Sequence, residues 1–530
     1  MTRLAHGAAW VAALVSLWVY AVTLSPTVAW VNQGEDSGDL LAASATLGIP
    51  HPTGYPLFVL LGRLASLVPL GSVAFRINLV AALAGAAGVY FLVRYVCELA
   101  ARGGPAGARL AAPAAVLAAV GASLLYAFSR GAWSQSVLAE VYTLNIALFG
   151  AILWSCARSD RDGDYRFLAL AAFLLGLGLA NHLLILAAAP AVAWSAGRSL
   201  AARKIGLPGL VLLPLLSVWG ATLILYLPVR ASLPGTAGGP EFSWGVPSTP
   251  ERLWWMVRGA QYTRNFFTRE AAEIWAHLVP GRWGLDFGPG LLVIAAGAAA
   301  AAWGRVRDLG PALAALAAAL VLLSLYAIAD DVGYWMPVAW LACAIAGTGA
   351  AALVPARDAA AGGNPAPRGP ARIGAALGAL LLLAAGWSAW SHARVVDASK
   401  DLTPYLYAHR NLAAVEPDAL IVSEYDGRTF SLWFYKATDF RESHPRLVVA
   451  YKYLLVWPWY AHHLARTYPG LRVPRARADL DETMNVLIAR NLDHRPVYLT
   501  RLDPGLAPRF RAEPVGYPPI PLYRIRWAAP

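Results

Sequence analysis

Long apolar segments alternate with short polar ones through the first 390 residues of the chain. A helix needs about 20 predominantly apolar residues to cross the hydrocarbon core of a bilayer, and most of these segments approach that length. The pattern therefore predicts a polytopic α-helical membrane protein with about eleven transmembrane helices. We expect them at residues 8–24, 73–96, 111–128, 141–156, 207–228, 288–304, 311–328, 334–354 and 373–390, with two short helices within 167–196 that meet at Asn181 and His182.

The pattern changes after residue 390, where the chain becomes too polar to span a membrane. The β-rich runs DALIVSE, HPRLVVAYKY and RPVYLTRL alternate there with stretches that suit helices. This alternation predicts a small α/β domain at residues 391–530. Residues 1–390 would then form the transmembrane domain, with outer loops at 25–72 and 229–287.

Basic residues in short loops indicate the orientation of the chain. Arg and Lys gather in loops such as 157–166 and 197–204, and loops of this kind lie on the cytoplasmic side of a membrane. We therefore expect a cytoplasmic N-terminus and an extracytoplasmic C-terminal domain. The first apolar segment has a basic start but no clear small-residue cleavage site, so we expect a retained helix rather than a removed signal peptide.

The composition supports a membrane protein and argues against a nucleic-acid partner. Hydrophobic residues make up 58% of the chain and charged residues only 14%, whereas soluble domains carry roughly 25% charged residues. The net charge of +12 resides mainly in the short loops, where it sets orientation. The three cysteines lie in or beside apolar segments without metal-ligand spacing.

Candidate chemistry gathers in residues 30–63, directly after the first apolar segment. Glu35, Asp36, Asp39 and His51 all lie in this stretch, and acidic groups beside a membrane are costly unless they face water or a partner. One interpretation is structural, with Asp36 capping a helix that begins near Ser37 and Asp39 in its first turn. The functional interpretation is a general base that takes a proton from an attacking hydroxyl group.

Other candidates are single residues, each with a structural alternative. The arginines would contact a phosphate, or extend to lipid headgroups; Glu140 would bind substrate or cap a helix; His51 and His182 would bind substrate or make a hydrogen bond. We expect substrate-binding roles for Glu35, His51, Tyr55, Arg63, Arg76, Glu140, His182 and Arg230.

Several motifs resemble a known family. The block GEDSGDLLAASATLGIPHPTGYPLFVLLGRLASLVPLGSVAFRINL resembles the N-terminal hallmark of domain-of-unknown-function family 2723, which includes the transmembrane-protein-260-like protein O-mannosyltransferases. Similar motifs are FSRGAWSQSVLAEVYTLN, GLGLANHLLIL, YLPVRA with FSWGVPST, and DDVGYWMPV, so the resemblance extends over about the first 340 residues. The stretch DGRTFSLWFYK resembles one in bacterial members, without a known role.

This resemblance implies a membrane glycosyltransferase of the C type (GT-C). Such enzymes have many helices, a catalytic acid in the first outer loop, and a polyprenyl- or dolichyl-phosphate sugar as donor. Asp36 matches the position expected for the catalytic acid, and Asp39 stands where the family often has Glu. The implied reaction transfers a sugar, with mannose the first guess, to a hydroxyl of a protein, glycan or lipid on the extracytoplasmic face, with inversion.

Partners and alternatives follow from the same interpretation. The lipid-phosphate sugar is a substrate, no resident cofactor is expected, and a divalent metal is not required, although Glu35 and the two aspartates could hold one. The alternative function is a transporter or flippase of lipid-linked sugars that performs no transfer. A third alternative is a binding protein, in which the helices only anchor an outer binding domain to the membrane. The Ala- and Arg-rich composition suggests a bacterial inner membrane, with the active face toward the periplasm or cell exterior.

Overall fold

The computed structural model describes residues 3–101, 113–233, 241–279, 281–303, 306, 308–328, 330–354 and 368–528. The chain forms two compact units. The first unit contains residues 1–24, 81–224 and 262–397, and the second contains 25–80, 225–261 and 398–530.

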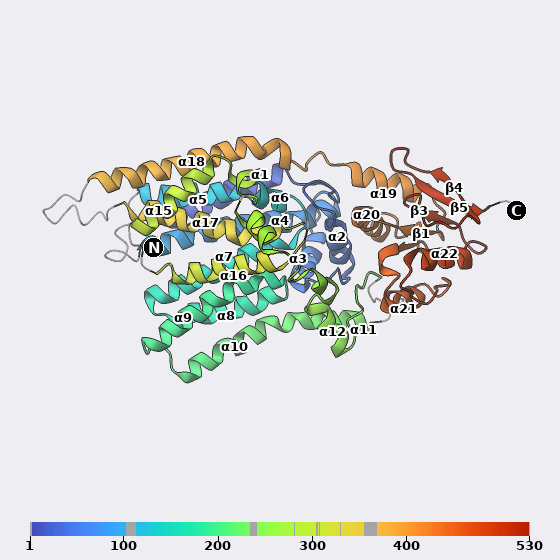
Figure 1. The fold of residues 1–530 in the computed structure, drawn as a ribbon, viewed down its shortest axis with the longest axis horizontal. Helices are drawn as coiled ribbons and strands as arrows, with labels where there is room; N and C mark the ends of the chain where they lie inside the picture. The colour runs from blue at the N-terminus through green and yellow to red at the C-terminus, as the bar shows by residue number, and fades with distance from the viewer. Residues whose placement is uncertain are drawn as a thin grey trace. The chain divides into compact units, whose positions relative to one another are not determined.

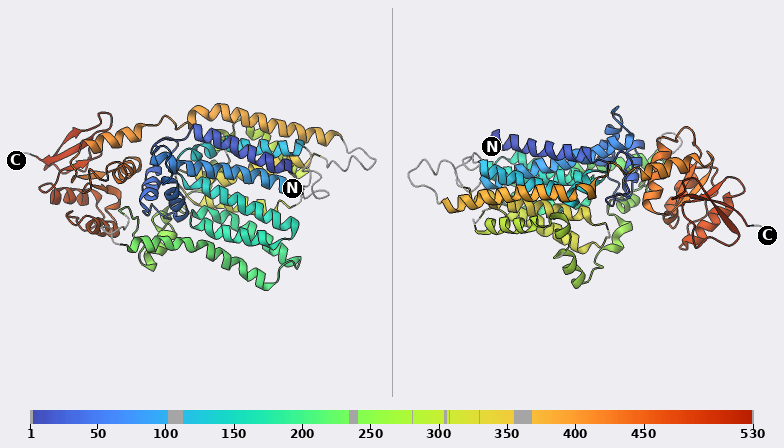
Figure 2. Two further views of the ribbon diagram at one scale, coloured as in Figure 1. Left: turned by 180° about the vertical axis from the view of Figure 1, so that it is seen from behind. Right: turned by 90° about the horizontal axis from the view of Figure 1, so that it is seen from above.

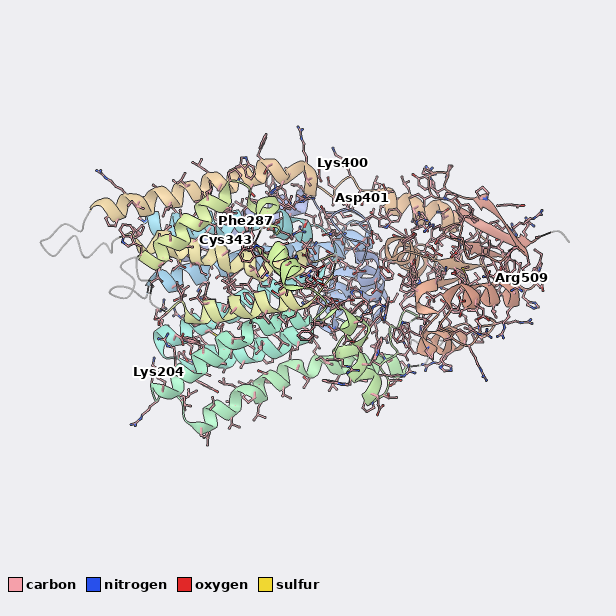
Figure 3. All side chains as sticks on the ribbon, viewed as in Figure 1. Lys204, Phe287, Cys343, Lys400, Asp401 and Arg509 are labelled. Atoms are coloured by element: carbon pink, nitrogen blue, oxygen red, sulfur yellow. The ribbon has the colours of Figure 1, made fainter. Side chains whose placement is uncertain are left out.

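The first unit consists of apolar helices that pack side by side (Figure 1). Helix α5 lies along α18, α8 along α10, and α15 along α17 (Figure 2). Phe287 and Cys343, labelled in Figure 3, are completely buried in this unit. The helices are α1 (Arg3–Val22), the greater part of α4 (Val73–Ala101), α5 (Pro113–Ala127), α6 (Arg130–Ser136), α7 (Val141–Asp162), α8 (Tyr165–Leu179), η2 (Leu183–Ala188), α9 (Ala189–Ala201), α10 (Leu207–Ala221), α13 (Ala271–Leu278), α14 (Trp283–Phe287), α15 (Gly290–Trp303), α16 (Gly310–Leu325), α17 (Val332–Ala352) and α18 (Arg368–Val396).

Close backbone contacts explain two of the glycines in these helices. A Cβ atom at Gly176 of α8 would lie 1.8 Å from the carbonyl oxygen of Ser217 in α10. A Cβ atom at Gly349 of α17 would lie 2.0 Å from the carbonyl oxygen of Gly297 in α15. Small residues at such contacts allow helices to pack closely where lipid removes the hydrophobic drive for association.

The helices confirm a multi-pass membrane protein. Within the described residues, seven helices are long and apolar enough to cross a membrane, or up to nine if each of two bent pairs forms one span. Three shorter apolar helices are α3, α8 and α16. All of the predicted segments overlap helices, and the predicted break at Asn181 and His182 is confirmed, because α8 ends at Leu179 and a 3₁₀ helix begins at Leu183.

The second unit contains a five-stranded sheet and several short helices. The strands are β1 (Leu420–Ser423), β2 (Val448–Tyr451), β3 (Val497–Leu499), β4 (Phe510–Val515) and β5 (Leu522–Trp527), in the order β2-β1-β3-β5-β4. The helices are α2 (Ser37–Thr46), α3 (Pro56–Ser66), α11 (Tyr226–Ser232), α12 (Pro250–Val257), α19 (Thr403–Ala413), α20 (Asp426–Ala437), η7 (Lys452–Leu454), α21 (Pro458–Thr467) and α22 (Leu480–Asn491). The predicted C-terminal α/β region is confirmed.

Strand β1 occupies the centre of the parallel part of this sheet. Leu420 pairs in parallel with Val448 of β2 on one side and with Val497 of β3 on the other. All residues of these three strands are buried, which explains their continuous apolar runs. In open α/β sheets, ligands bind outside the carboxyl ends of the strands where the strand order reverses. Asp426 lies just beyond this end of β1.

The second unit also gathers segments that are far apart in the sequence. Residues 25–80, which include the predicted outer loop 25–72, belong to the same unit as 398–530. The backbone N–H groups of Trp30 and Val31 donate to Asp401 Oδ2 at 3.0 and 3.4 Å (Asp401 is labelled in Figure 3). The predicted domain boundary at residue 391 stays a prediction, while this grouping brings the acidic stretch against the α/β region.

Candidate active site

Asp36 occupies the N-cap position of α2 but does not cap it. Its φ and ψ angles of −77° and −14° are helical, and its side chain makes no capping hydrogen bond. The side chain is 42% exposed. The structural interpretation of Asp36 as a simple N-cap therefore does not explain this residue, and its carboxylate remains accessible to other groups.

Asp39 and His51 form a tightly bonded pair beside Asp36. Asp39 is buried, and its Oδ2 accepts a 2.8 Å hydrogen bond from the backbone N–H of His51. The same oxygen lies 2.8 Å from Nδ1 of the imidazole, while Nε2 lies 3.8 Å from Asp36 Oδ2. An ionised carboxylate can only accept, so Nδ1 carries the proton and Nε2 is directed toward Asp36. Asp39 thus contacts His51, whereas Asp36 is the accessible acid.

Asp426 is an acid of this site that we did not predict from the sequence. It is the first residue of α20, and its Oδ1 accepts a hydrogen bond from the Tyr451 hydroxyl. Burial, followed by the negative charge of Asp36, raises the pKa of Asp426 to about 6. Burial also raises the pKa of Asp36, against the opposing effect of His51. We refer to Asp36, Asp39, His51 and Asp426 as the acidic centre.

Close packing of α2 against α20 brings these acids together. A Cβ atom at Gly38 would lie 2.7 Å from the carbonyl carbon of Phe430, so only glycine fits there without a shift. The indole N–H of Trp30 donates to Gly427 O at 2.9 Å and to Ser431 Oγ at 3.1 Å. The second glycine of GEDSGD, Gly38, is therefore explained by helix packing.

Aromatic rings surround the imidazole of His51. The ring centroids of Tyr55 and Trp244 lie 5.0 and 6.2 Å from that of His51. The Tyr55 hydroxyl donates to Pro52 O at 2.7 Å, so this residue holds the loop around His51. Trp244 comes from the FSWG motif. Its backbone N–H donates to Ile49 O at 2.9 Å, so this motif pairs with the start of the IPHPTGYP segment.

Two of the predicted phosphate-binding arginines meet at the other end of α2. Arg63, Arg230 and Arg441 line the same cleft. Arg63 Nη1 donates to Ala45 O at 2.7 Å, and Arg230 Nε donates to Leu47 O at 2.8 Å. Helix α2 has ten residues, so it separates this cleft from Asp36 by about 15 Å. Both arginines stabilise the carbonyl end of α2.

The remaining candidates lie apart from the acidic centre or at its edge. Arg76 Nη1 donates to the carbonyl oxygens of Ser66 and Val68, both at 2.5 Å, and so holds the turn after α3. Glu35 is exposed beside Asp36. In the part of the chain that the structure describes, no three His, Cys, Asp or Glu side chains are grouped to hold a metal ion.

Glu140 and His182 belong to the first unit. Glu140 is buried at the N-cap position of α7 but makes no capping hydrogen bond. His182 Nδ1 accepts a 3.1 Å hydrogen bond from Leu184 N and so caps the 3₁₀ helix η2. The rings of Tyr142 and Tyr334 lie 5.2 and 5.8 Å from the His182 ring. His182 therefore makes a structural hydrogen bond at the start of η2, the helix that follows it.

The block that contains three members of the acidic centre also matches a known family model. Residues 36–202 match the model of the protein O-mannosyl-transferase TMEM260 N-terminal domain. The resemblance found in the sequence is confirmed. The TMEM260 protein of Mus musculus is 33% identical over 243 residues, which is 45% of this chain and 31% of the mouse protein. That of Dictyostelium discoideum is 26% identical over 201 residues, 33% of this chain and 22% of the relative.

The coverage limits what these TMEM260 relatives establish. The chain spans less than a third of the length of either one, at 31% and 22%. Asp36, Asp39 and His51 lie inside the TMEM260 N-terminal match at residues 36–202, whereas Asp426 lies outside it. A signal for Asp426 nevertheless existed in the sequence, because it lies three residues after the apolar run that forms β1, the middle strand of the parallel part of the sheet.

Solved structures show the fold over nearly the whole chain. ArnT from Cupriavidus metallidurans bound to undecaprenyl phosphate has a TM-score of 0.55 at 12% identity, with 97% of each chain covered. The apo state of the same protein has a TM-score of 0.50 at 14% identity, covering 89% of this chain and 96% of ArnT. The predicted GT-C fold with a small C-terminal α/β region is confirmed.

Proposed function

We propose that this protein is an integral membrane glycosyltransferase that uses Asp36 as a general base. The observation that carries the proposal is an accessible carboxylate at the start of α2 that caps nothing and faces the Nε2 atom of a histidine held by a buried acid. A site of this kind suits removal of a proton from a hydroxyl group, since the base must be reachable by the acceptor.

The substrates are suggested by the relatives. Both curated relatives are named protein O-mannosyl-transferases, so the expected sugar is mannose and the expected acceptor is a Ser or Thr hydroxyl of a protein. The ArnT structure holds undecaprenyl phosphate, which supports a polyprenyl-phosphate sugar as the donor. The lipid would enter from the bilayer and the acceptor from the extracytoplasmic side. The curated relatives are eukaryotic, and a bacterial source stays a prediction.

The proposed reaction is a single displacement. Asp36 takes the proton of the acceptor hydroxyl while the acceptor oxygen attacks the anomeric carbon from the face opposite the phosphate. The bond from the anomeric carbon to the phosphate oxygen breaks, and its electron pair leaves with the polyprenyl phosphate. The configuration at the anomeric carbon is inverted. The chemistry requires no resident cofactor, and a divalent metal is not part of the proposal.

His51 and Asp39 support Asp36 in this proposal. Asp39 holds Nδ1 of the imidazole, which directs Nε2 toward Asp36. Positive charge on His51 would favour the ionised carboxylate of Asp36, whereas its partial removal from water raises its pKa. His51 and Asp39 are therefore positioning residues that act through Asp36.

The experiment combines the purified full-length protein with polyprenyl-phosphate mannose and a synthetic Ser/Thr peptide. We expect a peptide product heavier by one hexose, detected by mass spectrometry. Asp36→Asn should lower kcat by about a hundredfold or more and leave thermal unfolding unchanged, because the side chain makes no capping bond. The matched control is Asp439→Asn, an exposed acid just beyond α20.

Two results would decide against the proposal. If the Asp36→Asn variant transferred the sugar at the wild-type rate, Asp36 would not be the general base. Movement of the lipid-linked sugar across liposomes, without any glycosidic product from the wild-type protein, would instead establish the transporter function.

A further inference from the structure

Asp426 lies at the edge of the sheet where ligands bind in open α/β folds. It follows β1, whose neighbours β2 and β3 are both parallel to it, and the carboxyl ends of such strands form a ligand-binding crevice. Tyr451, the last residue of β2, reaches Asp426 from the neighbouring strand. Two adjacent strand ends thus present their polar side chains together.

The packing of α20 on α2 directs this edge toward Asp36. Gly38, the second residue of α2, meets Phe430, the fifth residue of α20, and Trp30 bonds to Gly427, the residue after Asp426. Asp36 and Asp426 therefore lie at the same ends of two helices in contact. The groups that affect the charge of Asp426 are Asp36, Asp39 and His51 from the α2 side, and Tyr451 from β2.

A purely structural role does not account for Asp426. An acid in the first turn of a helix benefits from the helix dipole, but this benefit would be the same without a second acid nearby. Among the described residues, no Lys or Arg forms an ion pair with Asp426, and only its Oδ1 has a hydrogen-bond partner. Repulsion from Asp36 opposes its ionised form. A partly buried acid whose pKa is raised by a second acid is typical of functional sites.

We propose that Asp426 is the acceptor-binding carboxylate of the acidic centre. Its Oδ2 accepts a hydrogen bond from the acceptor, such as the backbone N–H beside the reacting Ser or Thr, while Tyr451 holds Oδ1. The acceptor hydroxyl is thereby aligned with Asp36. This inference rests on the proposed glycosyltransferase function and adds to it a catalytic residue from the C-terminal region.

The test measures Asp426→Asn in the full-length protein with polyprenyl-phosphate mannose and the Ser/Thr peptide. We expect the KM for the peptide to rise about tenfold or more, because the peptide loses its hydrogen bond to the charged Asp426 carboxylate. The KM for the lipid-linked sugar should stay within about twofold of the wild type. The selective rise of the peptide KM is the discriminating result, because a merely structural role would change the KM values of peptide and donor together.

Asp439→Asn is the matched control, because it makes the same chemical change beyond the other end of α20. A peptide KM equal to the wild type would overturn the proposal, as would an equal rise of both KM values. If Asp426→Asn does not fold, Tyr451→Phe decides: a raised peptide KM alone supports the proposal, and an unchanged one overturns it. Failure of the proposed function would be seen in a different experiment, in which the Asp36→Asn variant transfers sugar at the wild-type rate.

Discussion

The Nδ1 atom of His51 lies 2.8 Å from Oδ2 of the buried Asp39. This bond determines which imidazole nitrogen carries the proton, and it leaves Nε2 directed at Asp36, 3.8 Å away. The two aspartates of GEDSGD therefore have different positions, since one is accessible and the other reaches the site through His51. Both were predicted as catalytic acids, Asp36 first and Asp39 second, and both assignments stay predictions.

Substitution of Asp39 by Asn should impair catalysis more than binding. The amide has no charge to stabilise the Nδ1–H tautomer, so Nε2 no longer faces Asp36 in the same protonation state. We expect kcat to fall about tenfold to a hundredfold, with both KM values within about threefold. Steady-state kinetics with both substrates measures this split. A wild-type kcat would show that the Asp39 and His51 pair has no part in the reaction.

Substitution of Gly38 by Ala should separate α2 from α20. The new Cβ atom would lie 2.7 Å from the Phe430 carbonyl carbon, and backbone cannot yield as a flexible side chain does. We expect a loss of about 1–3 kcal/mol in the free energy of unfolding, together with reduced transfer activity. The free energy is measured by denaturant unfolding in detergent.

Gly386→Ala provides the control for this prediction. Gly386 lies in α18, and a Cβ atom there would meet nothing within 4 Å. The control should be neutral, or stabilising by up to about 1 kcal/mol, because Ala is the better helix former. Equal effects of the two substitutions would show that the contact between α2 and α20 is not tight.

The sequence predicted those features that depend on local pattern. Each apolar segment has the length of a helix, and the break at His182 follows from a polar pair in an apolar run. The accessible acid at Asp36 was also predictable, since an acidic stretch beside a membrane needs a function. The strands of the C-terminal region were visible as short apolar runs because they are buried.

The features that the sequence did not predict depend on distant contacts. Trp30 and Gly427 are bonded across 397 positions, and no local periodicity encodes such a pair. The place of Asp426 in the acidic centre follows from that contact. Arg63 and Arg230 were predicted as phosphate ligands, but the structure shows that the carbonyl end of α2 also requires cations. A sequence alone does not distinguish these two uses of arginine.

The stability of the protein should depend on His463 below neutral pH. His463 Nε2 donates to Glu241 O at 2.7 Å, and burial lowers the pKa of His463 to about 4. This value is below the 6.5 of an ordinary histidine, so the unfolded chain binds the proton more readily. Stability present above pH 6.5 is therefore lost as the pH falls toward 4.

His463→Gln should weaken this pH dependence, because Gln can donate to the same carbonyl and does not titrate. The measurement is the Tm of the variant and the wild type between pH 7 and pH 4. The matched control is His462→Gln, which changes the exposed neighbour and should keep the wild-type dependence. Parallel Tm curves for His463→Gln and the wild type would contradict the assignment.

Arg230 should contribute to stability rather than to contact with the reacting phosphate. Its Nε donates to Leu47 O at 2.8 Å, and its Nη2 to Thr46 O at 3.4 Å. Because α2 separates these bonds from Asp36 by about 15 Å, a phosphate next to Asp36 would be out of reach. We expect Arg230→Gln to lower the free energy of unfolding by about 1–2 kcal/mol and to leave the donor KM within about twofold of the wild type.

Arg441→Gln separates the two possible roles of the arginine cleft. Arg441 lines the same cleft, is exposed, and has no hydrogen-bond partner among the residues that the structure describes. Its loss should leave unfolding unchanged, whereas loss of Arg230 should not, because Arg230, unlike Arg441, donates to carbonyl oxygens at the end of α2. If both variants instead raised the donor KM about tenfold without any change in unfolding, the cleft would bind the lipid phosphate. Asp36 would then lie too far from the scissile bond to act as the base.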